Sequence, residues 1–214
     1  DLIVFPEMSL TGYPPQDLLL DNGFITKALD ALKKVSQCVK ETPVILGTIR
    51  KDKNALYNTA AILKNGGILA YRDKTHLPTY DIFDEDRYFS SSGEIKPLEV
   101  EVGGSSMKLG VQICEDLWDD DYEIKVSNQL VEEGAKMLIN ISASPFNINR
   151  MDERLSIING KASHLKCYFI YCNLVGAQDE LVFDGQSCVV DPKGRLVASL
   201  PAFKEVVEVV NLDE

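Results

Sequence analysis

The stretch Val111-Gln112-Ile113-Cys114-Glu115-Asp116-Leu117-Trp118 reads V-Q-I-C-E-D-L-W and changes abruptly from apolar residues to acids. The short apolar run over residues 108–113 predicts a strand that delivers Cys114 at its end. Side chains at strand ends beside irregular loops are often catalytic, but free cysteine also packs as a small hydrophobe. Cys114 is therefore either a nucleophile or one more buried thiol, and the rest of the chain has to decide.

Strand and helix signals alternate on both sides of this stretch. Helices are expected from Asp21 or Asn22 to Val39, over residues 121–134 and over residues 152–166. The Asn65-Gly66-Gly67 turn predicts a hairpin and so antiparallel pairing, whereas strand–helix–strand runs predict parallel pairing. Together they predict one α/β domain over residues 1–214 with mixed sheets in layers. Strands are expected at residues 2–5 (buried), 44–49, 57–64, 68–72, 108–113, 137–141, 168–174, 187–190, 196–200 and 206–210, and a long loop at 74–92.

Composition narrows the class of protein. The 214 residues are 45% hydrophobic and carry a net charge of -11, which argues against nucleic acid or an anionic membrane as partner. The chain has no apolar run of membrane-spanning length. Its five cysteines are scattered without a C-x-x-C pair, so we expect no disulfide scaffold, no metal site and a cytoplasmic location. Four of them are expected to be core thiols: Cys38, Cys167, Cys172 and Cys188.

Three polar residues follow apolar runs and form a complete set for acyl transfer. A carboxylate such as Glu7 can take the proton of a thiol such as Cys114, and the ammonium of Lys74 can stabilise the oxyanion that then forms. Taken singly, each has a simpler interpretation, as a loop acid, a core thiol and a solvated charge. Spacing alone does not show that they converge.

Five segments resemble the nitrilase, or carbon–nitrogen hydrolase, superfamily. F-P-E-M-S-L-T-G-Y-P-P-Q-D-L-L, residues 5–19, resembles its catalytic-glutamate segment, and most closely that of the glutaminase domains of glutamine-dependent NAD synthetases. K-T-H-L-P-T-Y-D-I-F-D-E-D-R-Y-F, residues 74–89, is similar to the lysine segment, and I-C-E-D-L-W to the nucleophile segment. Residues 142–146 (S-A-S-P-F) and 179–185 (D-E-L-V-F-D-G) match further signatures of this subgroup.

The resemblance implies an α-β-β-α sandwich and a role for each residue of the set. Cys114 is expected to attack the side-chain amide of glutamine, with Glu7 as general base. Lys74 is expected to stabilise the tetrahedral intermediate with the backbone N–H after Cys114. Glu85 falls where the superfamily often places a second glutamate. The alternative, that Glu85 only pairs with nearby Arg87, is equally open.

The same resemblance implies a set of glutamine-binding residues. Glu115 suits the α-ammonium of the substrate, while the remaining acids up to Asp121 are expected to be partly solvated. Ser144 is expected at the substrate, with Ser142 as the open alternative. Trp118 either walls the pocket or only packs, and His76 is expected to be a loop residue. The full set implied as substrate-binding is Tyr13, Tyr80, Glu115, Trp118 and Ser144.

The resemblance also implies what lies outside these residues. The subgroup has a second domain that binds ATP through a Ser-Gly-Gly-x-Asp-Ser loop, and this sequence lacks that motif. We therefore expect no cofactor here, ATP and Mg²⁺ in a C-terminal synthetase domain, and a homo-oligomer. The chain begins inside an apolar run without Met, so the first strand and helix of the domain are expected to be missing. The open alternatives are a free-standing amidohydrolase acting on another small amide and a non-catalytic module.

Overall fold

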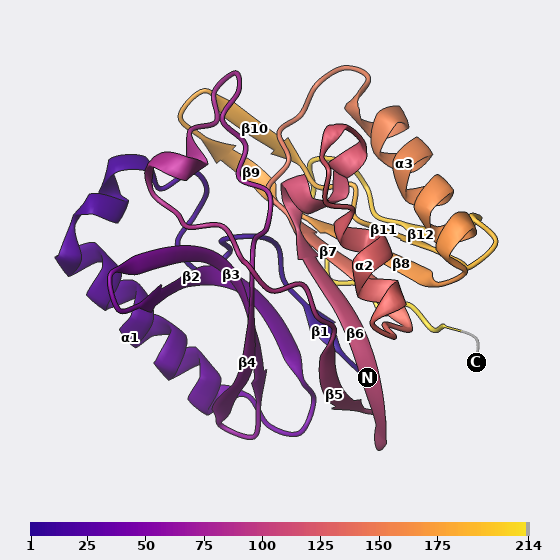
Figure 1. Cartoon of the computed structure of the whole chain (residues 1–214), viewed down its shortest axis with the longest axis horizontal. Helices are drawn as coiled ribbons and strands as arrows, with labels where there is room; N and C mark the ends of the chain where they lie inside the picture. The colour runs from indigo at the N-terminus through magenta and orange to yellow at the C-terminus, as the bar shows by residue number, and fades with distance from the viewer. Residues whose placement is uncertain (213–214) are drawn as a thin grey trace.

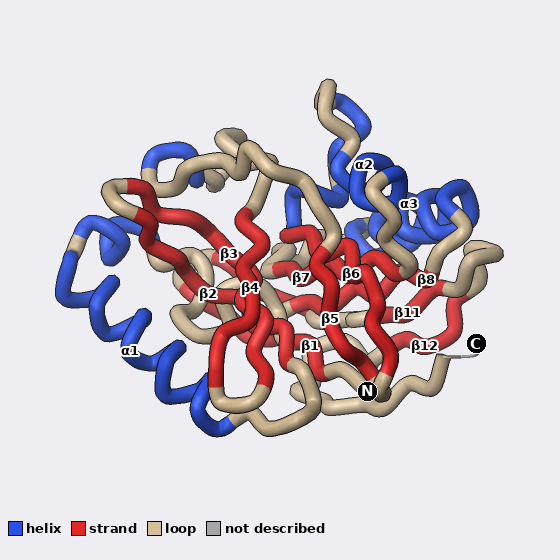
Figure 2. The backbone as a smooth tube through the Cα atoms, turned by 60° about the horizontal axis from the view of Figure 1, so that its bottom comes forward, coloured by secondary structure: helices blue, strands red, loops and turns tan. Residues whose placement is uncertain are grey.

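Two β-sheets pack against each other in the computed structural model, which describes residues 1–212 (Figure 2). The four-stranded sheet has the order β1-β2-β3-β4 and the six-stranded sheet the order β12-β11-β8-β7-β6-β5. The four strands of the first sheet are β1 (Ile3–Val4), β2 (Val44–Asp52), β3 (Ala55–Lys64) and β4 (Gly67–Asp73). Those of the second are β5 (Leu98–Val102), β6 (Ser105–Ile113), β7 (Met137–Ser142), β8 (Tyr168–Asn173), β11 (Cys188–Val190) and β12 (Leu196–Ser199). A separate hairpin pairs β9 (Val175–Gln178) with β10 (Leu181–Asp184).

Both large sheets are mixed, as the sequence predicts. β1 runs parallel to β2, which continues into an antiparallel β2-β3-β4 meander. In the second sheet β6, β7 and β8 are parallel, and β5, β11 and β12 pair antiparallel at its two sides. Parallel strands end at the same edge of a sheet, so the loops after β6, β7 and β8 gather together.

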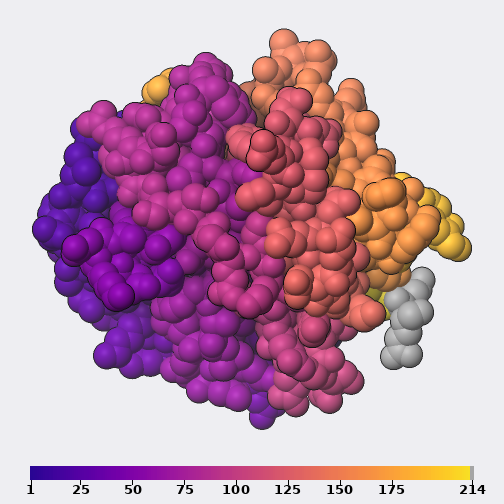
Figure 3. Space-filling view, viewed as in Figure 1, coloured from indigo at the N-terminus to yellow at the C-terminus, as the bar shows by residue number. Residues whose placement is uncertain are grey.

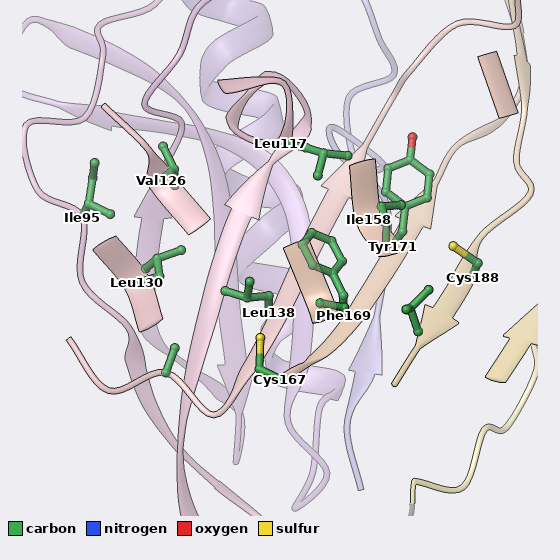
Figure 4. Close-up of a cluster of buried hydrophobic side chains, with 13 residues drawn as sticks. Ile95, Leu117, Val126, Leu130, Leu138, Ile158, Cys167, Phe169, Tyr171 and Cys188 are labelled. Carbon is green, nitrogen blue, oxygen red and sulfur yellow. The ribbon is translucent and has the colours of Figure 1, made fainter. Parts of the chain in front are cut away.

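Helices cover the outer face of each sheet, which confirms the predicted α-β-β-α sandwich (Figure 1). Helix α1 (Asn22–Cys38) packs Leu32 against β2 and β3 of the first sheet. Helices α2 (Val126–Glu132) and α3 (Arg150–Leu165) cover the second sheet, where the cluster drawn in Figure 4 includes Leu130, Leu138 and Phe169. A third apolar cluster lies between the sheets and contains Ile45, Ile62, Val111, Ile113, Ile139 and Cys114.

In the space-filling view, segments from the two halves of the chain are in continuous contact across one face (Figure 3).

Four short 3₁₀ turns complete the described structure: Gln16–Leu20, Glu85–Arg87, Cys114–Leu117 and Asp119–Asp121. Among residues 1–212, no helix is both long and apolar enough to cross a membrane.

Several sequence predictions need correction. The first strand lies at a sheet edge rather than buried, and Ile3 is 45% exposed because only β2 flanks it. Residues 206–210, all of them described, form no strand, since no neighbouring strand pairs with them. The helix expected from residue 121 begins only at Val126, because Lys125 Nζ binds the carbonyls of Asp119 and Asp120 and holds the preceding residues in a turn. The sequence analysis also missed β5, β9 and β10. It expected Cys38 to be a core thiol, but this cysteine is exposed.

Gly47 of β2 brings the segment after β1 against the first sheet. A Cβ at this position would lie 2.2 Å from the carbonyl oxygen of Pro6 and 2.6 Å from Cα of Glu7. The Gly47 carbonyl in turn accepts the N–H of Leu10 at 3.3 Å. Only a residue without a side chain allows this approach, so Gly47 fixes where Glu7 lies.

Replacing Gly47 by alanine is therefore expected to lower the free energy of unfolding by about 1–3 kcal/mol, the usual cost of overpacking. Urea denaturation measures it. The control is Gly93→Ala, because a Cβ at Gly93 meets no atom within 4 Å. Equal stability of the two variants would contradict this account of Gly47.

Candidate active site

Three strand ends of the sandwich carry the residues of the acyl-transfer set. Glu7 comes shortly after β1, Lys74 directly after β4, and Cys114 directly after β6. Cys114 has a φ of 43°, in the left-handed region that non-glycine residues seldom adopt. Such strained residues persist only where the surrounding structure holds them in place, and they cluster at functional sites.

Lys74 is the centre of a buried ionic cluster. Its Nζ lies 2.9 Å from Glu7 Oε1 and 2.8 and 2.9 Å from the two oxygens of Glu85. Glu7 is 0% exposed, Lys74 1% and Glu85 5%. Glu85 therefore contacts the lysine, while Arg87 pairs with Asp17 instead.

Each carboxylate has further donors that fix its orientation. Asn58 Nδ2 donates to Glu7 Oε1 at 2.7 Å, and the backbone N–H of Ala143 donates to Glu7 Oε2 at 2.8 Å. The hydroxyl of Tyr13 donates to Glu85 Oε1 at 2.8 Å. Tyr13 thus supports the second glutamate. Asn58 was missed by the sequence analysis, although a polar residue inside the buried run of β3 is a usable signal.

Burial and charge together set the ionisation of this cluster. Burial opposes the charged form of Lys74, yet Glu7 and Glu85 outweigh it and keep its pKa well above the usual value. Burial, and then the negative charge of Glu7, raise the pKa of the Cys114 thiol well above its usual value, with Lys74 opposing. Burial also raises the pKa of Glu85. A thiol with a raised pKa that is influenced by a nearby carboxylate suits general-base activation.

Glu115 is held next to the thiol by two tyrosines. The hydroxyl of Tyr80 donates to Oε2 at 2.9 Å, and that of Tyr122 to Oε1 at 3.0 Å. Burial, and then the Glu115 charge, raise the pKa of Tyr122 to about 12, so both residues stay hydroxyl donors. The ring of His76, which is buried, stacks on Tyr122 at 3.9 Å between centroids.

The loop after β7 is fastened by the buried Arg154. Its guanidinium donates to the carbonyl and hydroxyl oxygens of Ser144 at 2.9 and 3.1 Å, and pairs with Asp184 at 2.9 Å. Ser142 donates instead to Asn140 at 2.6 Å. The Ser142 hydroxyl is therefore used as a donor inside the protein, whereas the Ser144 hydroxyl accepts from Arg154.

Two features at this site differ from the sequence expectations. Asp120 and Asp121 are exposed, as expected of a partly solvated run, but Asp116 and Asp119 are both 0% exposed. Trp118 is half-buried, and the guanidinium of Arg150 lies 5.1 Å from its ring centroid. The sequence analysis did not select Arg150, although it is a cation at the start of α3, just beyond the Ser144 loop.

A cavity of about 220 Å³ lies beside the ionic cluster. Tyr13 and Glu85 line it together with Phe83, Tyr88 and Leu181. Cys114 is not among the residues that line this cavity. Among the described residues, no three His, Cys, Asp or Glu side chains are grouped as a metal site.

An α-β-β-α sandwich that carries Glu7, Lys74 and Cys114 at its strand ends, with the lysine buried between two glutamates, is the arrangement of a nitrilase-like protein. The carbon–nitrogen hydrolase family model matches residues 1–214. The chain belongs to this family.

Named proteins and solved structures are similar to nearly the whole length of this chain. The chain is 40% identical to the glutamine-dependent NAD(+) synthetase of Aquifex aeolicus and 41% identical to that of Thermotoga maritima, over 99% and 100% of its length. It spans about a third, 36%, of each of these relatives. The structure of a glutamine-dependent NAD+ synthetase from Acinetobacter baumannii superposes with a TM-score of 0.87 at 35% identity, covering 96% of this chain and 38% of that one. A Nesterenkonia AN1 amidase from the nitrilase superfamily gives a TM-score of 0.76 at 21% identity, with 94% and 73% covered, and so shares the fold.

Replacing Arg154 by methionine is expected to lower the free energy of unfolding by about 3–5 kcal/mol, because it leaves the Asp184 carboxylate buried without its partner. Thermal or urea unfolding measures the loss. The matched control is Lys96→Met, which breaks an exposed pair with Glu94 and should leave stability unchanged. A small effect of Arg154→Met would mean that the buried pair is dispensable.

The raised pKa of Cys114 predicts slow alkylation at pH 7, because a higher pKa leaves less thiolate at that pH. The rate with iodoacetamide, followed by mass spectrometry of the Cys114 peptide, should still be rising at about pH 9. An unperturbed cysteine with a pKa near 8.5 is already levelling off there. A plateau below pH 8 would contradict the prediction.

Proposed function

We propose that this chain hydrolyses the side-chain amide of glutamine. The observation that carries the proposal is the buried Lys74 ammonium, held between Glu7 and Glu85 and close enough to Cys114 to influence its ionisation. A base, a nucleophile and a fixed positive charge are what acyl transfer from an amide needs. The identity to glutamine-dependent NAD synthetases supports glutamine as the amide.

The proposed reaction has two steps with one thioester intermediate. Glu7 takes the thiol proton of Cys114 while the sulfur attacks the amide carbon. Lys74, with the backbone N–H after Cys114, stabilises the negative oxygen. When the C–N bond breaks, Glu7 returns the proton to the nitrogen, and ammonia leaves. Glu7 then deprotonates a water molecule that attacks the thioester. The C–S bond breaks and Glu7 returns the proton to the sulfur, which gives glutamate and the free thiol.

Glutamine recognition is proposed to rest on charges around the cluster. Glu115, fixed by Tyr80 and Tyr122, suits the α-ammonium group. Arg150, stacked on Trp118, suits the α-carboxylate. Ser144 contributes through the loop that Arg154 fixes, and Tyr13 through its bond to Glu85.

Within a longer protein, the released ammonia is proposed to serve the ATP-dependent amidation of nicotinic acid adenine dinucleotide to NAD. The chain covers only 36% of its named relatives, which leaves room there for a synthetase domain that binds ATP and Mg²⁺. This chain's own proposed reaction uses its side chains and one backbone N–H, without a cofactor. A cytoplasmic location and a homo-oligomer complete the proposal.

Ammonia release from glutamine tests the proposal in the full-length protein. Cys114→Ala, Glu7→Gln and Lys74→Met are each expected to lower kcat at least about 100-fold, because each removes one role in the chemistry. Cys38→Ala, at an exposed cysteine outside the site, is the control and should retain full activity.

Two outcomes would overturn the proposal. Glutamine hydrolysis that survives Cys114→Ala excludes the thiol as nucleophile. Faster hydrolysis of a neutral amide such as propionamide than of glutamine would favour an amidohydrolase for another substrate. Loss of activity in all three variants with Cys38→Ala intact supports the assignment.

A further inference from the structure

Asp116 joins the two segments that carry Lys74 and Cys114. Its Oδ1 accepts the backbone N–H groups of Thr75 at 3.0 Å and His76 at 2.8 Å. Its Oδ2 accepts the backbone N–H of Ile113 at 3.0 Å. One carboxylate therefore holds the backbone just after the lysine and just before the cysteine.

The countercharge for this buried carboxylate comes from the lysine segment too. Arg72 Nη2 lies 3.9 Å from Asp116 Oδ2 and donates to Thr75 Oγ1 at 2.7 Å. Arg72 also donates to the carbonyl of Asp73, the residue before Lys74. Because a buried charge is costly without partners, Asp116 and these donors are expected to move as one unit.

The strained backbone at Cys114 gives this connection a further consequence. The φ of 43° has to be held by its surroundings, and the Asp116–Ile113 hydrogen bond closes the turn in which it occurs. The backbone N–H of Lys74 donates to the carbonyl of Asn58 at 2.9 Å, and the carbonyl of Lys74 accepts the N–H of Ser92 at 2.8 Å. The Asp116 contacts add the one direct connection among these bonds from the lysine segment to the nucleophile turn.

We propose that Asp116 is a positioning residue that sets the distance between the Lys74 ammonium and the Cys114 sulfur. This inference rests on the proposed hydrolysis of an amide by Cys114. Asp116 does not touch substrate; it acts through the two backbone segments that it fastens. Without it, the oxyanion formed at Cys114 meets a misplaced Lys74, whereas Glu115 stays on its two tyrosines and still binds substrate.

The test is Asp116→Asn in the full-length protein, which keeps the shape but puts an NH₂ group where an acceptor is needed. We expect kcat for glutamine to fall about 10- to 100-fold, because misplacement by about 1 Å can cost 100-fold. KM should change less than about threefold. If Asp116 only stabilised the fold, Asp116→Asn would lower the folded fraction but leave the kcat of the folded protein unchanged.

The matched control is Asp119→Asn. Asp119 is equally buried and also ion-paired, but its partner is Lys161 on α3, and its side chain bonds neither the lysine segment nor the nucleophile turn. It should lose stability and keep the kcat of its folded fraction. A loss of kcat in Asp119→Asn as large as in Asp116→Asn would overturn the proposal.

Arg72→Lys decides the question if Asp116→Asn does not fold. It keeps the charge and loses the fork that joins Asp116 to Thr75, so kcat should fall about 3- to 10-fold at constant KM. If kcat is unchanged in whichever of Asp116→Asn and Arg72→Lys folds, the proposal is overturned.

Alkylation of Cys114 by iodoacetamide separates this inference from the proposed function. If the unsubstituted protein releases no ammonia from glutamine, the proposed function fails, but the alkylation rate still reports on the site. Slower alkylation in Asp116→Asn than in Asp119→Asn supports the positioning role, and equal rates overturn it. Cys114→Ala gives the background from the other cysteines.

Discussion

The structure depends on the burial of one ammonium between two carboxylates. Lys74, Glu7 and Glu85 are at most 5% exposed, and charges removed from water are tolerated only when they are paired and hydrogen-bonded. The end of β4, the segment after β1 and the turn before Tyr88 therefore have to meet at one place. Under the proposed function, the same cluster also provides the base and the positive charge for the neighbouring thiol.

The sandwich supports the cluster through backbone constraints. Gly47 allows the Glu7 segment to lie against β2, and the N–H of Ala143, after β7, binds the other side of the same carboxylate. Glu7 is thus held by both sheets at once. In the proposed reaction, little reorganisation is then needed, which is how fixed dipoles and charges favour a developing oxyanion.

Buried acids divide into two kinds at this site. Glu7, Glu85 and Glu115 each accept a hydrogen bond from a titratable side chain, whereas the hydrogen bonds that Asp116 accepts come from backbone N–H groups. Under the proposed function, the first kind determines proton and charge chemistry, and the second fixes geometry. The acidic run after Cys114 resembles a solvated loop in the sequence because it is rich in charge, but charge alone does not reveal whether a partner exists.

The sequence by itself determined the layered mixed α/β class, the strand ends at Lys74 and Cys114, and the residue types of an acyl-transfer set, because periodicity and strand ends are local properties. The family resemblance added the roles of Glu7 and Glu85. Only the tertiary structure decided that Glu85 contacts Lys74, that Asn58 and Ala143 hold Glu7, and that Asp116 and Asp119 are buried. It also left residues 206–210 without a strand. These outcomes depend on contacts between residues far apart in the chain, and no local pattern encodes which partner a charge or a strand will find.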